Sequence, residues 1–236
     1  MSTPHSVTPI GVIRTPFHEK YTAPRQPGAD GEFALGRVVL DKGHNFEQAL
    51  ADLSGFEKIW LVYLFDRNTN WKPKVLPPRS SVKRGVFATR SPHRPNPIGL
   101  SLVTLLEIRG RTLIVEGVDM LDHTPVLDIK PYLPTIEAFP GARTGWVADS
   151  EPQNDTVREI VFDPEFVTAV NELPEAERTA ILGHVRRMLR FDIRPHPYKR
   201  IALESDGSYT LAYKAWRIRF ERTEAGDVLI SRLRTA

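Results

Sequence analysis

The stretch Ile59-Trp-Leu-Val-Tyr-Leu-Phe65 is an unbroken run of aliphatic and aromatic side chains. A strand with one face in water alternates apolar and polar residues, whereas a strand covered on both faces reads as a continuous apolar run. Similar short apolar runs, separated by proline- and glycine-rich turns, recur up to about residue 147. We therefore predict that this stretch is a strand covered on two sides, within a largely β domain.

Further strands are predicted on the C-terminal side of this run. Val86-Phe-Ala88 is a short candidate, and Ile98 to Ile108 is a longer one. Arg109-Gly-Arg111 makes a short hairpin connection to a partner strand over Thr112 to Val118. Consecutive strands with tight connections favour an antiparallel meander that closes into a barrel. Apolar residues at three- and four-residue spacing predict one helix over residues 45–53.

The composition changes towards the C-terminal third. Residues 148–155 are polar and rich in turn formers, which is typical of a domain boundary. Asp163-Pro164 then offers a helix N-cap with proline at the first helical position, and Trp216 to Glu221 alternates like a strand. We predict a mainly β protein with an N-terminal antiparallel β-barrel (1–147) and a small α+β C-terminal domain (148–236).

The composition also excludes several kinds of chemistry. The chain has no cysteine, which excludes disulfides, thiol nucleophiles and cysteine-based metal sites. Its histidines are scattered and His184 fits the core side of a helix, so no metal is expected. A net charge of +3 admits an anionic partner without identifying one. No signal peptide or membrane span is recognisable, so we expect a cytoplasmic protein with no membrane association.

The familiar nucleotide, zinc-protease and hydrolase motifs are absent from the sequence. Polar residues instead gather at the ends of apolar strands, above all in Thr89-Arg-Ser-Pro-His-Arg-Pro-Asn-Pro-Ile-Gly99. Taken singly, each such segment is explained as a turn. Taken together they read as rigid loops on a β scaffold, where proline lowers the entropy lost when a loop holds one shape around a ligand.

These segments resemble motifs of the TsaA/TrmO family of tRNA methyltransferases, and they occur in the family's order. They are Pro9-Ile-Gly-Val-Ile-Arg-Thr-Pro16, Ala23-Pro-Arg-Gln-Pro-Gly28, Gly85-Val-Phe-Ala-Thr-Arg-Ser91, Arg94-Pro-Asn-Pro-Ile-Gly99 and Asp128-Ile-Lys-Pro-Tyr-Leu-Pro134. The resemblance spans roughly Pro9 to Trp146, and the C-terminal third resembles the extra domain of bacterial members more loosely.

The resemblance implies S-adenosylmethionine-dependent methylation of N6 on N6-threonylcarbamoyladenosine (t6A) at tRNA position 37. It also implies a non-Rossmann β-barrel enzyme and a homodimer whose cofactor site uses both subunits. The absence of a glycine-rich loop after the first strand agrees with a non-Rossmann fold. The rival hypothesis is a non-catalytic RNA- or small-ligand-binding barrel, which would release S-adenosylmethionine unchanged.

The resemblance further implies which residues bind the cofactor. They are Pro24, Arg25, Gln26, Asp66, Arg67, Arg94, Leu102, Asp122, His123, Thr124 and Pro125. Asp122 would accept hydrogen bonds from ribose hydroxyls or from the amino group. Arg25 or Arg94 would hold the carboxylate, and Leu102 would form a wall for the adenine.

The candidate catalytic residues are Asn96, Asp122 and Asp128. Methyl transfer is an in-line displacement at a carbon that the sulfonium already activates, so positioning supplies much of the rate. The attacking nitrogen must lose a proton to Asp122, to Asp128 or to water, while Asn96 could hold the base or its threonylcarbamoyl group. The alternative for Asp128 is a surface ion pair with Lys130.

Substrate contacts are expected at Arg90, Lys130 and Tyr132, and in a basic segment from Arg186 to Arg200. This segment, which includes Arg187 and Arg190, mixes basic and aromatic residues in a way that suits RNA phosphates and unstacked bases. A solvated helix face followed by a loop is the alternative interpretation of the same residues.

Overall fold

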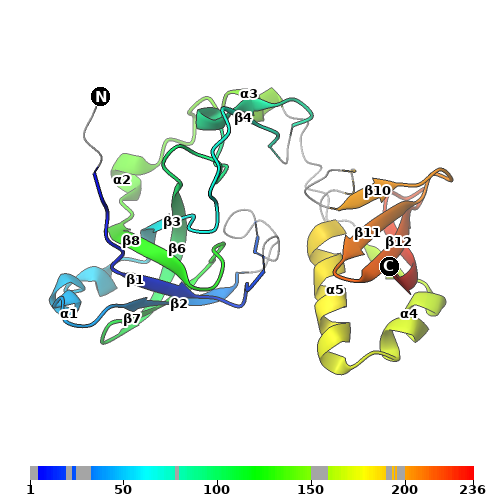
Figure 1. The fold of residues 1–236 in the computed structure, drawn as a ribbon, viewed down its shortest axis with the longest axis horizontal. Helices are drawn as coiled ribbons and strands as arrows, with labels where there is room; N and C mark the ends of the chain where they lie inside the picture. Colours follow the sequence, from blue (N-terminus) through cyan, green and yellow to red (C-terminus); the bar gives the residue numbers. More distant parts are fainter. Residues whose placement is uncertain are drawn as a thin grey trace. The chain divides into compact units, whose positions relative to one another are not determined.

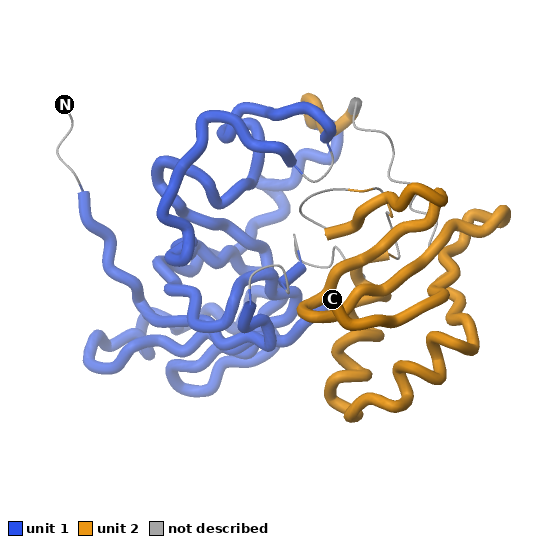
Figure 2. The backbone as a smooth tube through the Cα atoms, turned by 45° about the vertical axis from the view of Figure 1, so that its right-hand side comes forward, with its two compact units in different colours: residues 1–142 blue, residues 143–236 orange. Residues whose placement is uncertain are grey.

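The computed structural model describes residues 5–19, 23–24, 33–77, 80–149, 159–189, 193, 195 and 200–236. The chain forms two compact units, Met1–Ala142 and Arg143–Ala236 (Figure 2). The sequence places the boundary slightly later, after residue 147. Among the described residues, no helix is long and apolar enough to cross a membrane.

The first unit is built around a closed antiparallel barrel with the strand order β1-β2-β7-β6-β3-β8, as the sequence predicts (Figure 1). Its strands are β1 (Gly11–Arg14), β2 (Leu35–Leu40), β3 (Lys58–Leu64), β6 (Ile98–Arg109), β7 (Thr112–Glu116) and β8 (Thr124–Pro131). Closure pairs every barrel strand on both sides, so the barrel presents no open sheet edge.

The strand order is not the predicted meander. β3 lies between β6 and β8, and β2 pairs with β7. The hairpin between β6 and β7 is predicted correctly, because Gly110 supplies the positive φ of 57° that its turn requires. Turn residues identify such local hairpins, but they do not indicate which distant strands pair, and this is why the meander is wrong.

Two local predictions also fail. Val86–Ala88 forms the 3₁₀ turn η2 instead of a strand, and the Thr89 hydroxyl donates to the Val86 carbonyl oxygen at 2.8 Å to close it. The helix predicted over 45–53 shortens to α1 (Phe46–Ala49), followed by the 3₁₀ turn η1 (Leu53–Gly55). Asp52 adopts a left-handed conformation, with φ of 64°, that an α-helix cannot include.

The remaining elements of this region are short. β4 (Lys74–Val75) and β5 (Arg84–Gly85) pair as a ribbon within the connection from β3 to β6. The helix α2 (Pro134–Glu137) follows the last barrel strand, and α3 (Trp146–Asp149) lies at the start of the second unit. The connection from β3 to β6 also contains most of the stiff turn from Thr89 to Gly99, whose last two residues begin β6.

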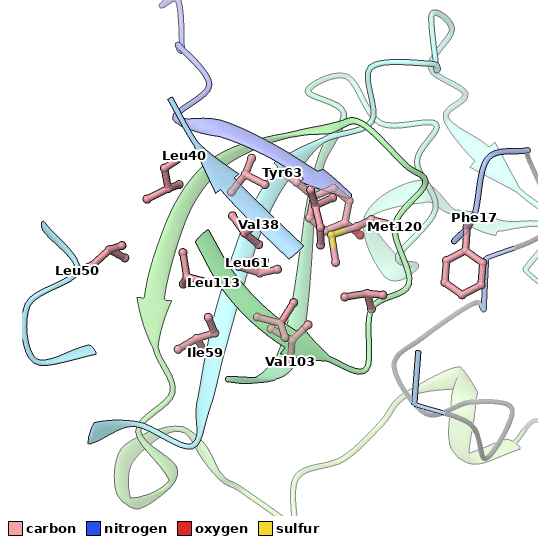
Figure 3. Close-up of a cluster of buried hydrophobic side chains, with 14 residues drawn as sticks. Phe17, Val38, Leu40, Leu50, Ile59, Leu61, Tyr63, Val103, Leu113 and Met120 are labelled. Atoms are coloured by element: carbon pink, nitrogen blue, oxygen red, sulfur yellow. The ribbon is translucent and has the colours of Figure 1, made fainter. Parts of the chain in front are cut away.

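The apolar run that predicts the fold becomes β3, and its two faces differ. Ile59, Leu61 and Tyr63 point into the barrel and are buried, and they form part of the cluster shown in Figure 3. Trp60 and Val62 lie on the outer face and are half-buried. The inner side of β3 therefore supplies the core, while its outer side remains partly accessible.

The second unit packs helices against one face of a sheet with the order β10-β11-β12-β13-β9, which is the predicted α+β arrangement. Its elements are β9 (Ile160–Phe162), α4 (Pro164–Asn171), α5 (Glu175–Leu189), β10 (Ile201–Leu203), β11 (Tyr209–Tyr213), β12 (Trp216–Arg222) and β13 (Val228–Thr235). Asp163 caps α4 as predicted, because its Oδ1 accepts from the Glu165 amide at 2.9 Å. The buried side of α5, which includes His184, packs towards Ile218 and Phe220 of the sheet.

Gly99 lies so close to Tyr63 that a Cβ at this position would come within 2.3 Å of the aromatic ring. We expect Gly99→Ala to lower the free energy of unfolding by about 1–3 kcal/mol, because the ring must move in a filled barrel. Chemical denaturation measures this change. Gly85→Ala is the matched control, since nothing lies within 4 Å of its Cβ position. Equal stability of the two variants would contradict the tight packing.

Candidate functional site

The turn that leads into β8 is hydrogen-bonded to β1 and to the residues that follow β1. The Asp122 amide donates to the Phe17 carbonyl oxygen at 2.7 Å, and the His123 amide donates to the Ile13 carbonyl oxygen at 2.8 Å. His123 adopts a left-handed conformation with φ of 66°. These bonds hold the predicted cofactor-binding segment 122–125 in one shape at the end of β1.

The Asp122 carboxylate is surrounded by donors. Its side chain is 8% exposed, and Oδ1 accepts from the Thr15 amide at 3.0 Å. His123 Nδ1 lies 2.8 Å and His18 Nδ1 lies 3.3 Å from Oδ2, while Arg14 Nε lies 3.5 Å from Oδ1. Burial alone would raise the pKa of Asp122, but the Thr15 hydrogen bond and these three side chains lower it below its usual range. The carboxylate is therefore anionic and already engaged with the protein.

Arg67 joins the end of β3 to this turn. Its Nη1 donates to the His18 carbonyl oxygen at 3.1 Å, and its Nη2 donates to the Asp122 carbonyl oxygen at 2.7 Å. The neighbouring Asp66 is exposed. The structure thus brings the predicted residues Asp66, Arg67, Asp122 and His123 together at one end of the barrel.

The stiff turn from Thr89 to Gly99 is held by side chains as well as by its prolines. Arg94 Nη1 donates to the carbonyl oxygens of Thr89 at 2.7 Å and Val86 at 3.2 Å. Asn68 Nδ2 donates to the Pro92 carbonyl oxygen at 2.7 Å, which links the turn to the end of β3. Arg94 therefore fixes the loop itself, while the predicted catalytic residue Asn96 is exposed on it.

Three polar residues near β3 and β6 form a chain of hydrogen bonds. The acidic residue among them, Asp119, is not one of the site residues predicted from the sequence. Ser101 Oγ donates to Asp119 Oδ1 at 2.6 Å, and the Tyr63 hydroxyl lies 3.2 Å from Ser101 Oγ. Ser101 and Tyr63 are buried, and Asp119 is half-buried. We call these three residues the Asp119 chain.

Burial raises the pKa of Asp119 to about 6, and the Ser101 hydrogen bond, a hydrogen bond from the backbone and the charge of Arg90 only partly offset this. Burial and the Asp119 charge likewise raise the pKa of Tyr63. Asp119 stands three residues before Asp122 in the sequence, which is the one signal that could have identified it. The predicted substrate residue Arg90 therefore exerts its charge on the Asp119 chain.

Other predicted residues lie on the outer face of the barrel. A bulge between β3 and β8 pairs Tyr63 with Val126 but Val62 with Asp128, which turns Asp128 outwards. Lys130 Nζ lies 2.8 Å from Asp128 Oδ2. This hydrogen bond and the Asp128 charge raise the pKa of Lys130. The surface ion pair considered for Asp128 is thus present.

Leu102 belongs to the same outer face. It pairs with Trp60, which in turn pairs with Lys130 across β3 and β8. The Tyr132 ring packs edge-on against Trp60 with centroids 5.8 Å apart. The predicted residues therefore divide into a group at the barrel end and a group on its outer wall.

The remaining predicted residues are distributed as follows. Pro24 and Pro125 are half-buried and Thr124 is buried. Arg186 is exposed on α5, with its guanidinium 6.0 Å from the centroid of the Phe162 ring, and Arg187 is half-buried. Arg25, Gln26 and Arg190 lie outside the described residues. Within the described ranges, no group of three or more His, Asp or Glu residues could hold a metal ion.

Comparison with known proteins gives consistent matches. Residues 12–138 match the family model of the tRNA-methyltransferase O N-terminal domain. The tRNA (adenine(37)-N6)-methyltransferase of Escherichia coli is 36% identical over 92% of this chain and 93% of its own length. A probable S-adenosyl-L-methionine-binding protein of Archaeoglobus fulgidus is 43% identical over 66% of this chain, which spans 42% of that protein. The crystal structure of TrmO from Pseudomonas aeruginosa aligns with a TM-score of 0.62 and 31% identity, over 98% of this chain and 99% of its own.

The two carboxylates of the 119–122 segment should respond to pH in opposite ways. The folded pKa of Asp119, about 6, lies above its ordinary value of 3.8, so its ionisation removes stability as the pH rises from about 4 to about 6. The lowered pKa of Asp122 instead adds stability that is present above its ordinary pKa and is lost as the pH falls.

We therefore expect Asp119→Asn to raise the free energy of unfolding by about 2 kcal/mol near pH 7.5 and to lose this advantage below about pH 4. Asp122→Asn should lower stability at neutral pH, with a difference that shrinks in acid. Urea denaturation between these pH values measures both. A loss of stability in Asp119→Asn at neutral pH would contradict the raised pKa.

Proposed function

Because the chain belongs to the tRNA-methyltransferase O family, we propose that it methylates N6 of t6A at tRNA position 37, to give N6-methyl-t6A. Methylation of N6 on adenine 37 by an S-adenosylmethionine-dependent enzyme is the activity that the family and the name of the Escherichia coli relative support. The observation that carries the proposal is 36% identity to that relative over 92% of the chain. The homodimer and the cytoplasmic location stay predictions.

The described residues fit a cofactor with a cationic sulfonium, an amino-acid zwitterion and an adenine. Exposed Asp66 offers a carboxylate to a cationic group, and half-buried Leu102 and Pro125 offer apolar surface. Arg67 and Arg94 fix the loops through backbone carbonyl oxygens, which gives these loops their shape before a ligand arrives. S-Adenosylmethionine, when bound, supplies a methyl group that its sulfonium activates.

The charge at the barrel end supports t6A as the substrate. The threonylcarbamoyl group carries a carboxylate, which needs cationic or N–H donors in the protein. Arg14, His18 and His123 surround Asp122 and are themselves largely exposed, with side-chain exposures of 47%, 72% and 56%. Exposed Arg90 adds a further positive charge near Asp119. An unmodified adenine offers these groups no anionic partner.

The chemistry of t6A also requires a proton acceptor. A carbamoyl group draws the N6 lone pair into its carbonyl, so N6 becomes a good nucleophile only as its proton leaves. An efficient general base has a pKa near the working pH. Asp119 meets this condition better than Asp122, whose pKa is lowered. The Asp128 carboxylate is engaged in an ion pair with Lys130.

We therefore assign the role of base to Asp119. Its carboxylate would accept the proton from N6 while Ser101 continues to donate to Oδ1. The Tyr63 hydroxyl beyond Ser101 keeps this serine oriented. Asn96, exposed on the stiff turn, would bind the base or its substituent, as the sequence suggests.

The proposal predicts that the purified chain transfers methyl groups from labelled S-adenosylmethionine to a tRNA that carries t6A37 and much more slowly to the same tRNA with unmodified A37. Nucleoside mass spectrometry of digested tRNA measures the product. An A37→G37 transcript is the control for methylation elsewhere. Equal rates on the two adenine substrates would remove t6A from the proposal, and cofactor binding without any methylation would favour the non-catalytic alternative.

A further inference from the structure

The second unit presents arginines on the sheet face that the helices do not cover. The buried residues Ile218 and Phe220 of β12 point towards α4 and α5, so the alternate residues Arg217 and Arg219 point to the opposite side. Across the ladder, Arg217 is paired with Arg234 and Arg219 with Arg232. We call the set formed by Arg200, Arg217, Arg219, Arg232 and Arg234 the arginine face.

This pairing is unfavourable for the fold on its own. Like charges directly opposite each other in an antiparallel ladder are destabilising. Arg219 is relieved by an ion pair with Asp206, and Arg232 by Glu165 at 3.0 Å. Arg217 Nη1 donates to the carbonyl oxygens of Lys214 and Trp216, but for Arg217 and Arg234 no carboxylate partner is found in the described part of the chain. The two guanidinium groups therefore repel each other in the free protein. We infer that this pair is kept because it binds an anion from another molecule.

The shape of the arginine face limits what this anion can be. Arg200, Arg217 and Arg234 line a shallow groove of about 500 Å³ together with the small side chains of Ala202 and Ala212. Thr210 offers a hydroxyl there, and Glu204 contributes a carboxylate, so cationic side chains outnumber anionic ones among the described lining residues. Among the residues that the structure describes, those lining the groove include no aromatic side chain on which a base could stack. Forked guanidinium groups beside small side chains suit phosphates.

We propose that the arginine face binds the phosphate backbone of the tRNA substrate. The identity of the polyanion as tRNA rests on the proposed function, whereas the phosphate chemistry rests on the arginines themselves. Charge complementarity favours this occupant, because backbone contacts by arginine and lysine supply most sequence-independent affinity for nucleic acids. Arg186 and Arg187 of the predicted basic segment lie on α5, which packs on the other side of the same sheet.

The test uses the full chain with Arg217→Gln and Arg234→Gln combined. Fluorescence anisotropy with a labelled tRNA transcript, in the absence of S-adenosylmethionine, measures affinity over a series of salt concentrations. We expect the dissociation constant to rise about tenfold at low salt, and the slope of log affinity against log salt to fall by about two units. The melting temperature should stay the same or rise, because the variant removes a like-charge pair.

The matched control is Arg178→Gln with Arg222→Gln, which removes the same charge from residues outside both the arginine face and the predicted basic segment. This control should bind tRNA nearly as well as the wild type. An unchanged affinity and salt slope in the sheet variant would overturn the proposal, as would equal weakening by both variants, which would indicate a general effect of net charge.

A further variant, Arg217→Lys with Arg234→Lys, keeps the charges and should therefore keep the salt slope. A failure of the arginine face as a tRNA-binding surface can be distinguished from a failure of the proposed methylation, because the binding assay involves no methyl transfer. A wild type that binds tRNA through the arginine face without methylating it would refute only the proposed function. A sheet variant that keeps the wild-type Michaelis constant for tRNA would refute only the arginine face.

Discussion

The position of β3 between β6 and β8 is the constraint on which both the core and the candidate site depend. It places Ile59, Leu61 and Tyr63 inside the barrel, where they join the buried cluster. It also sets Tyr63 beneath Gly99 and within reach of Ser101, so the stiff turn and the Asp119 chain meet the same ring. Because β3 pairs with β6 and β8, which are distant from it in sequence, the same pairings that close the barrel also bring the residues of the candidate site together.

Two aspartates three residues apart have environments that move their pKa values in opposite directions. Asp122 is encircled by an amide, two histidines and Arg14, and these keep its pKa low. Asp119 is half-buried, and its Ser101 and backbone hydrogen bonds and the charge of Arg90 only partly offset this burial, so its pKa rises to about 6. When the pKa values of two carboxyl groups are moved apart in this way, one can stay ionised and hold neighbouring residues while the other can take up and release a proton. Asp122 is held among the cationic groups, and Asp119 is the carboxylate that we propose as the base.

Much of the local structure in both units could be predicted from the sequence, because apolar runs, turn residues and capping residues report local structure. The strand over Ile59 to Phe65, the hairpin at Gly110 and the capping by Asp163 are of this kind. The strand order could not be predicted, since it depends on pairing between distant segments. Asp119 was missed because its pKa comes from burial beside Ser101 and Tyr63, which are distant in sequence. The arginine face was missed because alternation in β12 is visible in the sequence, whereas its register against β13 is not.

The most direct test of the assignment of Asp119 is the single-turnover rate of methyl transfer to t6A37 tRNA as a function of pH, in Asp119→Asn and Asp128→Asn. The wild-type rate should rise through about pH 6 and then level, because a base with this pKa must be ionised. Asp119→Asn should lose roughly a hundredfold or more in rate together with this pH dependence, while it binds S-adenosylmethionine normally. Asp128→Asn should remain within a few-fold of the wild type. A wild-type pH profile in Asp119→Asn, or the large loss in Asp128→Asn instead, would contradict the account.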